Sequence, residues 1–288
     1  GSEGLLGVVT EVTVRILQKP AVARGLLVGF ASVEAGARFV GAVIARGIIP
    51  GGMEMMDKAT IHAVERFQPC GYPLDAEALV IVELDGAQVE VDHLVDLVET
   101  IARDEGATTT KVSTSEAERL QFWAGRKNAF PAVSCIKPDY LCMDGTIPRA
   151  RLPEVLAGMD AIAKREGLQV ANVFHAGDGN LHPLILYDAS IEGEMERAEK
   201  VGFDILRLCV AVGGVLTGEH GVGVEKRDLM GEMFNETDLD QQLRVKCAFD
   251  SLNRLNPGKV FPTLHRCAEF GMMHVSGGKT PFPDLPRF

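Results

Sequence analysis

The sequence predicts an α+β fold in which two ferredoxin-like βαβ halves form an antiparallel sheet with helices on one face, followed by a helical C-terminal region. Two observations lead to this prediction. Strand patterns and amphipathic helix patterns alternate with short loops over most of the chain, and helical patterns dominate from Gly221 onward. The 288 residues are enough for one large domain or two modest ones.

In the first half of the chain, alternating apolar and β-branched residues predict strands, and amphipathic periodicity between them predicts helices. The predicted strands lie at residues 7–17, 23–32, 51–57, 78–86 and 109–114. The predicted helices lie at residues 33–47, 57–67, 91–106 and 115–130. A Ser-x-x-Glu-like cap opens the last of these helices at Ser115. The neighbouring methionines Met53, Met55 and Met56 are predicted to fill the core.

The second half repeats the pattern once. Strands are predicted at 140–147 and 213–217, with a hairpin at 168–188. Helices are predicted at 151–167, 193–212 and 239–252, and NPGK at 256–259 is a turn by its pattern. The expected organisation is a first segment 1–20, a main domain 21–262 and an irregular tail 263–288.

Composition excludes several classes of protein. The net charge of −11, with basic residues at most in pairs, argues against nucleic acid as a partner. No apolar run approaches the roughly 18 residues that a transmembrane segment needs. Six cysteines without a C-x-x-C pair argue against a zinc ribbon or an iron–sulfur cluster in this chain. No export signal is visible, so we expect reduced thiols and a cytoplasmic location, either free or peripheral at the inner face of the cytoplasmic membrane.

Two histidines, His175 and His182, flank the turn-forming run AGDGNL between two strand-like segments. Residues that close a hairpin from opposite strands share a face, with Cβ atoms about 4.5–5.5 Å apart. Two imidazoles in that arrangement can share one metal ion. The alternative is a pair of surface histidines beside a polar loop.

A second motif, TGEHGVG at 217–223, sets Glu219 and His220 side by side between glycines. Glycine permits unusual dihedral angles and the close approach of a ligand. In an extended stretch the two neighbours face opposite ways, so one could ligate a metal while the other addresses a substrate. Two histidines and one carboxylate leave coordination positions open. The alternative is a glycine-rich turn with both side chains in solvent.

The motifs form an ordered set. GSEGLLGVVTE, GGMEMMD, FWAGRKNAF, VFHAGDGNLHP, GGVLTGEHGVG and LNPGKVF follow one another along the chain, and together the sequence resembles the C-terminal domain of FAD-linked oxidases of the vanillyl-alcohol oxidase class. Within that family, YLCMDGTIPR and PTLHRCAEFG are similar to the flavin-bearing D subunits of bacterial glycolate oxidases.

The resemblance implies roles for five residues. His175, His182 and Glu219 would hold a divalent transition metal, for which zinc, iron and manganese all suit the ligand set. His220 would be the general base. Arg126, in the W-x-x-R element, would bind the substrate carboxylate with its guanidinium fork.

The resemblance also implies FAD as a cofactor. The residues that would border the flavin are Gly1, Ser2, Glu3, Gly4 and Asn256. Residues 1–20 resemble the end of a truncated FAD-binding domain, and no phosphate-cradling glycine motif stands in a strand–turn–helix context. We therefore expect this chain alone to bind FAD poorly and to be inactive alone.

The implied reaction is the oxidation of a small 2-hydroxy acid, glycolate to glyoxylate, with hydride transfer to flavin. Cys142 stands where relatives that oxidise longer diacids carry a lysine, which favours a small monocarboxylate. One alternative is a D-lactate or other D-2-hydroxy-acid dehydrogenase, and another is a metal-binding assembly module without catalysis. The implied partners are other glycolate oxidase subunits, including an iron–sulfur protein.

Overall fold

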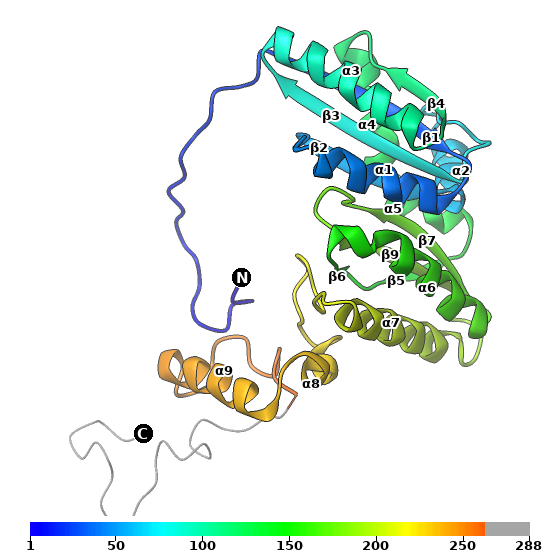
Figure 1. Ribbon diagram of the computed structural model, residues 1–288. Helices are drawn as coiled ribbons and strands as arrows, with labels where there is room; N and C mark the ends of the chain where they lie inside the picture. Colours follow the sequence, from blue (N-terminus) through cyan, green and yellow to red (C-terminus); the bar gives the residue numbers. More distant parts are fainter. Residues whose placement is uncertain (263–288) are drawn as a thin grey trace, which may run out of the picture. The chain divides into compact units, whose positions relative to one another are not determined.

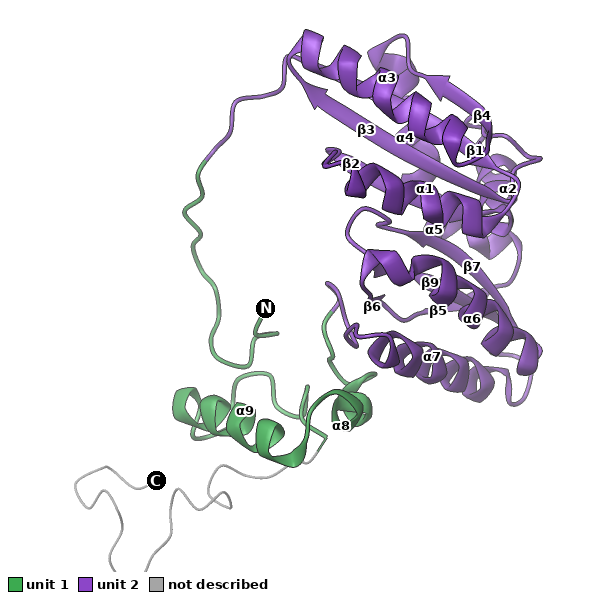
Figure 2. Cartoon of the chain, in the orientation of Figure 1, with its two compact units in different colours: residues 1–15, 221–288 green, residues 16–220 purple. Residues whose placement is uncertain are grey.

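The computed structural model describes residues 1–262 (Figure 1), so the predicted irregular tail at 263–288 lies outside the described residues. The chain divides into two compact units (Figure 2). Among the described residues, one unit consists of Gly1–Arg15 and residues 221–262, and the other consists of Ile16–His220. Within residues 1–262, no helix has both the length and the apolar character needed to cross a bilayer.

The larger unit is built on a seven-stranded antiparallel sheet with the strand order β4-β1-β3-β2-β7-β9-β5. The strands of this sheet are β1 (Val22–Phe30), β2 (Gly52–Asp57), β3 (Ala78–Gly86), β4 (Ala107–Val112), β5 (Asp139–Cys142), β7 (Gln169–Phe174) and β9 (Pro183–Tyr187). Two short strands, β6 (Gly145–Thr146) and β8 (Asn180–Leu181), pair separately.

The strand order is that of two βαβ halves joined side by side. β1 to β4 form a complete ferredoxin-like half in the order 4-1-3-2, and β5, β7 and β9 form a shorter half. The halves meet where β2 pairs with β7 through Met55 opposite Phe174 and Met56 opposite Val173. The predicted antiparallel sheet is confirmed. The strand predicted at 213–217 is reduced to a single bridge between Val215 and Thr146.

Helices cover both faces of the sheet (Figure 1). One layer contains α1 (Val33–Ala45), α3 (Gln88–Asp104), α6 (Leu152–Arg165) and α7 (Glu194–Ala211). The opposite layer contains α2 (Lys58–Phe67), α4 (Glu116–Lys127), α5 (Ala129–Ala132) and the 3-10 turn η1 (Val133–Cys135), and a further turn, η2 (Arg149–Arg151), precedes α6. The sequence predicts helices on one face of the sheet, whereas the structure has them on both faces. The physical reason lies in β3, where Ala78–Val82 is a continuous apolar run that is buried on both faces.

Side-chain caps fix where the helices begin. The Ser115 hydroxyl accepts a hydrogen bond from the Glu118 amide at 3.2 Å, which confirms the predicted cap of α4. Asp57 caps α2 by accepting from the Thr60 amide at 2.9 Å. Its other oxygen accepts from the Asn172 amide at 2.7 Å. Asp57 therefore fixes the start of α2 and also ties β2 to β7, the strand that leads to the histidine hairpin.

The smaller unit is helical, as predicted. It contains η3 (Arg227–Leu229), α8 (Met230–Met233) and α9 (Glu236–Phe249). A capping box between Asn235 and Asp238 opens α9. The Glu3 carboxylate accepts hydrogen bonds from the amides of Val222 and Gly223, each at 2.8 Å.

The strand predicted at 7–17 is wrong. These residues have no regular structure, and their apolar side chains are exposed, from 70% at Val14 to 87% at Ile16. An alternating pattern forms a strand only where a neighbour satisfies its backbone groups. Among residues 1–262 no strand pairs with this segment.

Candidate active site

The histidine hairpin joins β7 to β9. His175 follows the last residue of β7, and His182 precedes the first residue of β9. The backbone of His175 bridges to Asn180, which closes the loop. The two imidazole rings lie 5.1 Å apart, centroid to centroid. The hairpin therefore brings the rings together, as the sequence predicts.

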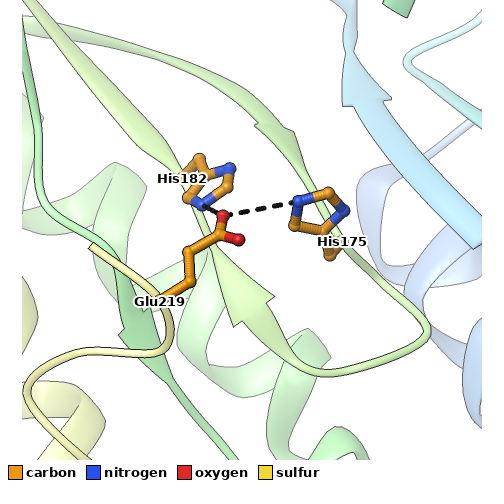
Figure 3. A group of neighbouring side chains, drawn as sticks. All are labelled: His175, His182 and Glu219. Carbon is orange, nitrogen blue, oxygen red and sulfur yellow. Dashed lines mark ion pairs between the residues drawn. The ribbon is translucent and has the colours of Figure 1, made fainter. Parts of the chain in front are cut away.

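Glu219 completes a cluster with these two histidines (Figure 3). Its Oε1 atom lies 2.8 Å from His182 Nε2 and 3.5 Å from His175 Nε2. One potential ligand atom from each of the three residues falls within 4.8 Å of the others. The His182 side chain is 3% exposed, whereas that of Glu219 is 49% exposed. The cluster thus has a buried base and an open side.

Asp144 shapes the loop that carries Glu219. It is fully buried, and its Oδ2 atom accepts hydrogen bonds from three successive amides: Gly218 at 2.9 Å, Glu219 at 2.8 Å and His220 at 2.9 Å. Three consecutive amides that converge on one oxygen require a curved backbone. The expectation that Glu219 and His220 face opposite ways along an extended stretch is therefore wrong.

His220 lies beside the cluster. Its ring stacks on that of His182, with centroids 4.9 Å apart and planes inclined by 17°. Its Nδ1 atom is 3.8 Å from Asp144 Oδ1, and its side chain is 44% exposed. The structure thus places a partly accessible imidazole directly against a buried one.

The protonation of the two hairpin histidines differs. Burial, and then the positive charges of His175 and His220, lower the pKa of His182 to about 4. The hydrogen bond to Glu54 raises the pKa of His175 above its ordinary value. That bond joins His175 Nδ1 to Glu54 Oε1 at 2.6 Å. His182 is therefore a neutral ring near pH 7, with lone-pair capacity for a ligand.

Arg126 lies on α4 and belongs to the same network. Its Nε atom donates to Glu54 Oε2 at 2.8 Å, and its side chain is 11% exposed. Glu54 itself is 6% exposed, so a buried carboxylate joins Arg126 to His175. The structure therefore connects the predicted carboxylate-binding residue to the predicted metal ligands.

The donor set suits a divalent cation. The Glu219 Oε1 atom is in ion-pair range of three imidazole nitrogens: His182 Nε2 at 2.8 Å, His175 Nε2 at 3.5 Å and His220 Nε2 at 3.5 Å. One proton can bridge only one of these contacts at a time. His182 Nδ1 is buried and has no hydrogen-bond partner within residues 1–262. Two imidazoles and a carboxylate are ligands of zinc, iron(II) and manganese. The carboxylate behind His175 is the support that metal-binding histidines usually have.

The residues predicted to border a flavin gather in the smaller unit. The Asn256 side-chain amide donates to the Glu3 carbonyl, and Gly4 adopts a positive φ of 73° beside Asn256. A hollow of about 250 Å³ is lined by Gly1, Ser2 and Glu3 together with residues of α9. These predicted residues therefore lie together, and their role stays a prediction.

Sequence reasoning missed two residues of the site, Glu54 and Asp144. Glu54 stands in the apolar strand run Gly52–Met56, where a lone carboxylate must find a buried partner. Asp144 interrupts the strand predicted at 140–147 and separates β5 from β6. A charged residue inside a buried segment was the signal available for both.

Known proteins are similar to this chain in sequence and in fold. The family model described as FAD linked oxidases, C-terminal domain, matches residues 19–260. The chain is 57% identical over its whole length to glycolate oxidase subunit GlcD of Escherichia coli K12, and it covers 58% of that protein. It is 34% identical over 91% of its length to glycolate oxidase subunit GlcD of Bacillus subtilis 168, covering 56% of it.

A more distant relative is a mitochondrial D-lactate dehydrogenase (cytochrome) of Arabidopsis thaliana. It is 28% identical over 93% of this chain, and this chain covers 47% of its length. Among solved structures, p-cresol methylhydroxylase aligns over 84% of this chain and 53% of its own, with a TM-score of 0.66 and 15% identity. 4-Ethylphenol oxidase of Gulosibacter chungangensis aligns over 85% of this chain and 55% of its own chain, with a TM-score of 0.65 and 14% identity.

The chain thus spans between about half and three fifths of the length of these relatives. The solved structures share its fold, with a sheet and helices arranged alike. The family model matches residues 19–260, which include the sheet, the histidine hairpin and the loop that carries Glu219. The chain therefore belongs to the family of FAD-linked oxidase C-terminal domains.

Proposed function

We propose that this chain holds the substrate and a divalent metal in an FAD-dependent oxidation of a small 2-hydroxy acid, glycolate to glyoxylate. The observation that carries the proposal is the convergence of His175, His182 and Glu219 beside His220. The 57% identity to a glycolate oxidase subunit supports glycolate as the substrate.

In this proposal His175, His182 and Glu219 hold the metal. A bound divalent cation supplies positive charge that favours the ionised form of a nearby hydroxyl group. His182 is suited to this role because its depressed pKa keeps the ring neutral, and Glu219 because its exposed side leaves room for substrate. Zinc, iron(II) and manganese are the ions that this ligand set fits.

Arg126 would bind the carboxylate of the substrate. Its Nε atom is engaged by Glu54, whereas the two Nη groups have no hydrogen-bond partner within residues 1–262. A guanidinium held at Nε presents both Nη groups in a fixed plane, which suits a bidentate grip on a carboxylate. A small acid would then lie between Arg126 and the histidine cluster.

His220 would take the hydroxyl proton. Its Nδ1 side faces Asp144, whose charge stabilises the imidazolium that forms, and its Nε2 is then the atom that accepts the proton. Oxidation also removes a hydride from C2 of the acid, and FAD, when bound, accepts it. One proton to His220 and one hydride to flavin account for the conversion of glycolate to glyoxylate.

The remaining assignments belong to the same proposal. Gly1, Ser2, Glu3, Gly4 and Asn256 would border the flavin. The names of the bacterial relatives describe subunits, which supports partner subunits for this chain. We propose that an iron–sulfur protein is among them. We propose a cytoplasmic location, free or peripheral at the inner face of the cytoplasmic membrane.

A second candidate is the oxidation of D-lactate. It is favoured by the similarity to D-lactate dehydrogenases, which extends over 93% of the chain in the Arabidopsis protein. The two acids differ by one methyl group, which a pocket discriminates by only about 1–3 kcal/mol. Relative affinity for the two acids therefore separates the candidates.

The experiment compares binding of glycolate and D-lactate to the manganese-loaded chain by titration calorimetry. We expect tighter glycolate binding and a loss of about 10- to 100-fold in Arg126→Ala, the value of one charge-assisted hydrogen-bonded pair. Arg165→Ala is the matched control, because Arg165 is an exposed arginine paired with Asp204.

Two results would change the assignment. Tighter binding of D-lactate than glycolate would favour the second candidate. If wild type and variant both bound metal but had no measurable affinity for either acid, the proposal would be overturned. The chain would then be a metal-binding module without catalysis.

A further inference from the structure

Glu54 connects two elements of the proposed site. It lies on β2, where its side chain is almost fully buried. Its Oε1 atom is 2.6 Å from His175 Nδ1 in the hairpin, and its Oε2 atom is 2.8 Å from Arg126 Nε on α4. Each oxygen of one carboxylate therefore faces a different residue of the site.

The contact with His175 determines which ring nitrogen carries a proton. A carboxylate can only accept hydrogen bonds, so the Nδ1 atom of His175 must donate. In the neutral ring the lone pair is then on Nε2, the atom that faces Glu219 at 3.5 Å. Glu54 thereby prepares His175 as an Nε2 ligand, whereas an unsupported imidazole would populate both tautomers.

The contact with Arg126 fixes a second orientation. A guanidinium is planar, so a hydrogen bond at Nε sets the direction of the whole group. Arg126 and Glu54 are both largely buried, with side chains 11% and 8% exposed, so solvent does not compete strongly for this contact. The same carboxylate therefore orients the group that would bind substrate and the group that would bind metal.

We propose that Glu54 is a positioning residue that sets the tautomer of His175 and the orientation of Arg126 together. The inference rests on the proposed function, because it gives Glu54 its purpose through the roles of those two residues. It predicts that loss of one carboxylate weakens metal binding and hydroxy-acid binding at once.

Glu83 offers a matched control on the neighbouring strand. It lies on β3 opposite Gly52 and, like Glu54, links the sheet to α4. Its Oε2 atom accepts from the Trp123 indole and pairs with Arg119. Glu83 has the same type of contact with α4, but no contact with His175 or Arg126. A general loss of sheet-to-helix packing would affect both variants equally.

The first test measures Zn²⁺ affinity of the full chain by competition with a chelator. Glu54→Gln keeps the size of the side chain but has one oxygen and one amide group, so it can accept from only one of its two donors. We expect Zn²⁺ to bind about 10- to 100-fold more weakly in Glu54→Gln, as is typical when the support of a metal-bound histidine is lost. Glu83→Gln should bind Zn²⁺ as wild type does.

The second test reads the tautomer directly in the metal-free chain by ¹⁵N NMR at alkaline pH, where the rings are neutral. We expect His175 to carry its proton on Nδ1 in wild type and Glu83→Gln, and to populate both tautomers in Glu54→Gln. This readout needs neither metal nor substrate nor flavin, so it separates the role of Glu54 from the proposed function.

Either of two results would overturn the inference: a His175 proton on Nε2 in the wild-type chain, or an unchanged tautomer and unchanged Zn²⁺ affinity in Glu54→Gln. If the wild-type chain showed the Nδ1 tautomer but bound no Zn²⁺, the metal proposal would fail, while the control of His175 by Glu54 would stand.

Discussion

The His220 imidazole lies stacked on the His182 imidazole, with ring centroids 4.9 Å apart and an interplanar angle of 17°. One ring is nearly buried and belongs to the cluster with Glu219, and the other is 44% exposed. The proposed proton acceptor and a proposed metal ligand are therefore in direct contact. Asp144 makes this possible, because it curves the loop so that consecutive residues converge on one place.

The roles proposed for the stacked pair predict that a mutation of His220 impairs catalysis without impairing metal binding. In a protein that joins this chain to an FAD-binding domain, His220→Asn should lower the rate of FAD-dependent hydroxy-acid oxidation by about 100- to 10,000-fold, the usual contribution of a general base. The metal content should not change, because His220 is not one of the three proposed ligands. Dye reduction and metal analysis on the same preparation measure both quantities.

His93→Asn is the control for that experiment, because His93 is an exposed residue on α3. It should leave both quantities unchanged. Loss of metal together with activity in His220→Asn would contradict the division of roles.

Asp144 should be essential for the loop. Asp144→Ala would leave three backbone amides, those of Gly218, Glu219 and His220, without their buried acceptor. At about 1–3 kcal/mol for each unsatisfied group, we expect a loss of about 3 kcal/mol or more in the free energy of unfolding. Urea unfolding measures this loss. A variant as stable as wild type would show that the amides find other partners.

Gly218 should be irreplaceable for a steric reason. A Cβ atom at this position would lie 2.1 Å from Asn180 Oδ1 and 2.4 Å from Thr146 Oγ1. Gly218→Ala must therefore displace the loop that carries Glu219, and we expect at least a tenfold loss of metal affinity, as is typical when the geometry around a ligand is disturbed. Chelator competition measures it.

Gly41→Ala is the matched variant, because a Cβ atom at Gly41 on α1 meets nothing within 4 Å. This change should preserve metal affinity and stabilise the chain by about 0.4–1 kcal/mol. Equal metal affinity in the two alanine variants would refute the steric explanation.

The depressed pKa of His182 predicts a pH dependence of stability in the metal-free chain. Its pKa is about 4 in the folded state and returns to about 6.5 on unfolding. Between these values the unfolded chain binds a proton that the folded chain does not, so the free energy of unfolding falls as pH is lowered from about 6.5 to 4. The His182 contribution is about 3 kcal/mol.

The raised pKa of His175 acts in another window. Its contribution to stability is complete below about 6.5 and is lost as pH rises through its folded-state value. The two effects therefore do not overlap. Urea titrations in the presence of a chelator should show the acid-side slope in wild type and a reduced slope in His182→Gln. Parallel curves for the two proteins would contradict the assignment.

Local patterns predicted much of the fold. The strand expected at 23–32 is β1 at Val22–Phe30, and the helix expected at 115–130 is α4 with its Ser115 cap, continued by α5. Periodicity and caps are local properties, so a single sequence contains them. The strand expected at 7–17 fails because its formation depends on a partner strand, which a local pattern does not specify.

The candidate site likewise has one part that local patterns predict and another that depends on contacts between distant segments. His175 and His182 are seven residues apart, so a hairpin prediction is enough to bring them together. Glu54 meets His175 across 121 positions of sequence, and Asp144 meets His220 across 76. The first contact exists because β2 pairs with β7, and that neighbour relation is a property of the whole sheet. Local reasoning could flag both carboxylates as buried charges but could not name their partners.

The metal content of the purified chain, measured by mass spectrometry beside Glu219→Ala, tests the central claim most directly. Three ligand atoms within 4.8 Å predict about one equivalent of a transition metal in wild type, and its loss in Glu219→Ala, because two imidazoles alone bind a divalent ion weakly. Glu225→Ala is a suitable control, because Glu225 lies in the following segment outside the cluster. A wild-type chain that binds no transition metal even after incubation with zinc, iron(II) and manganese would contradict the account.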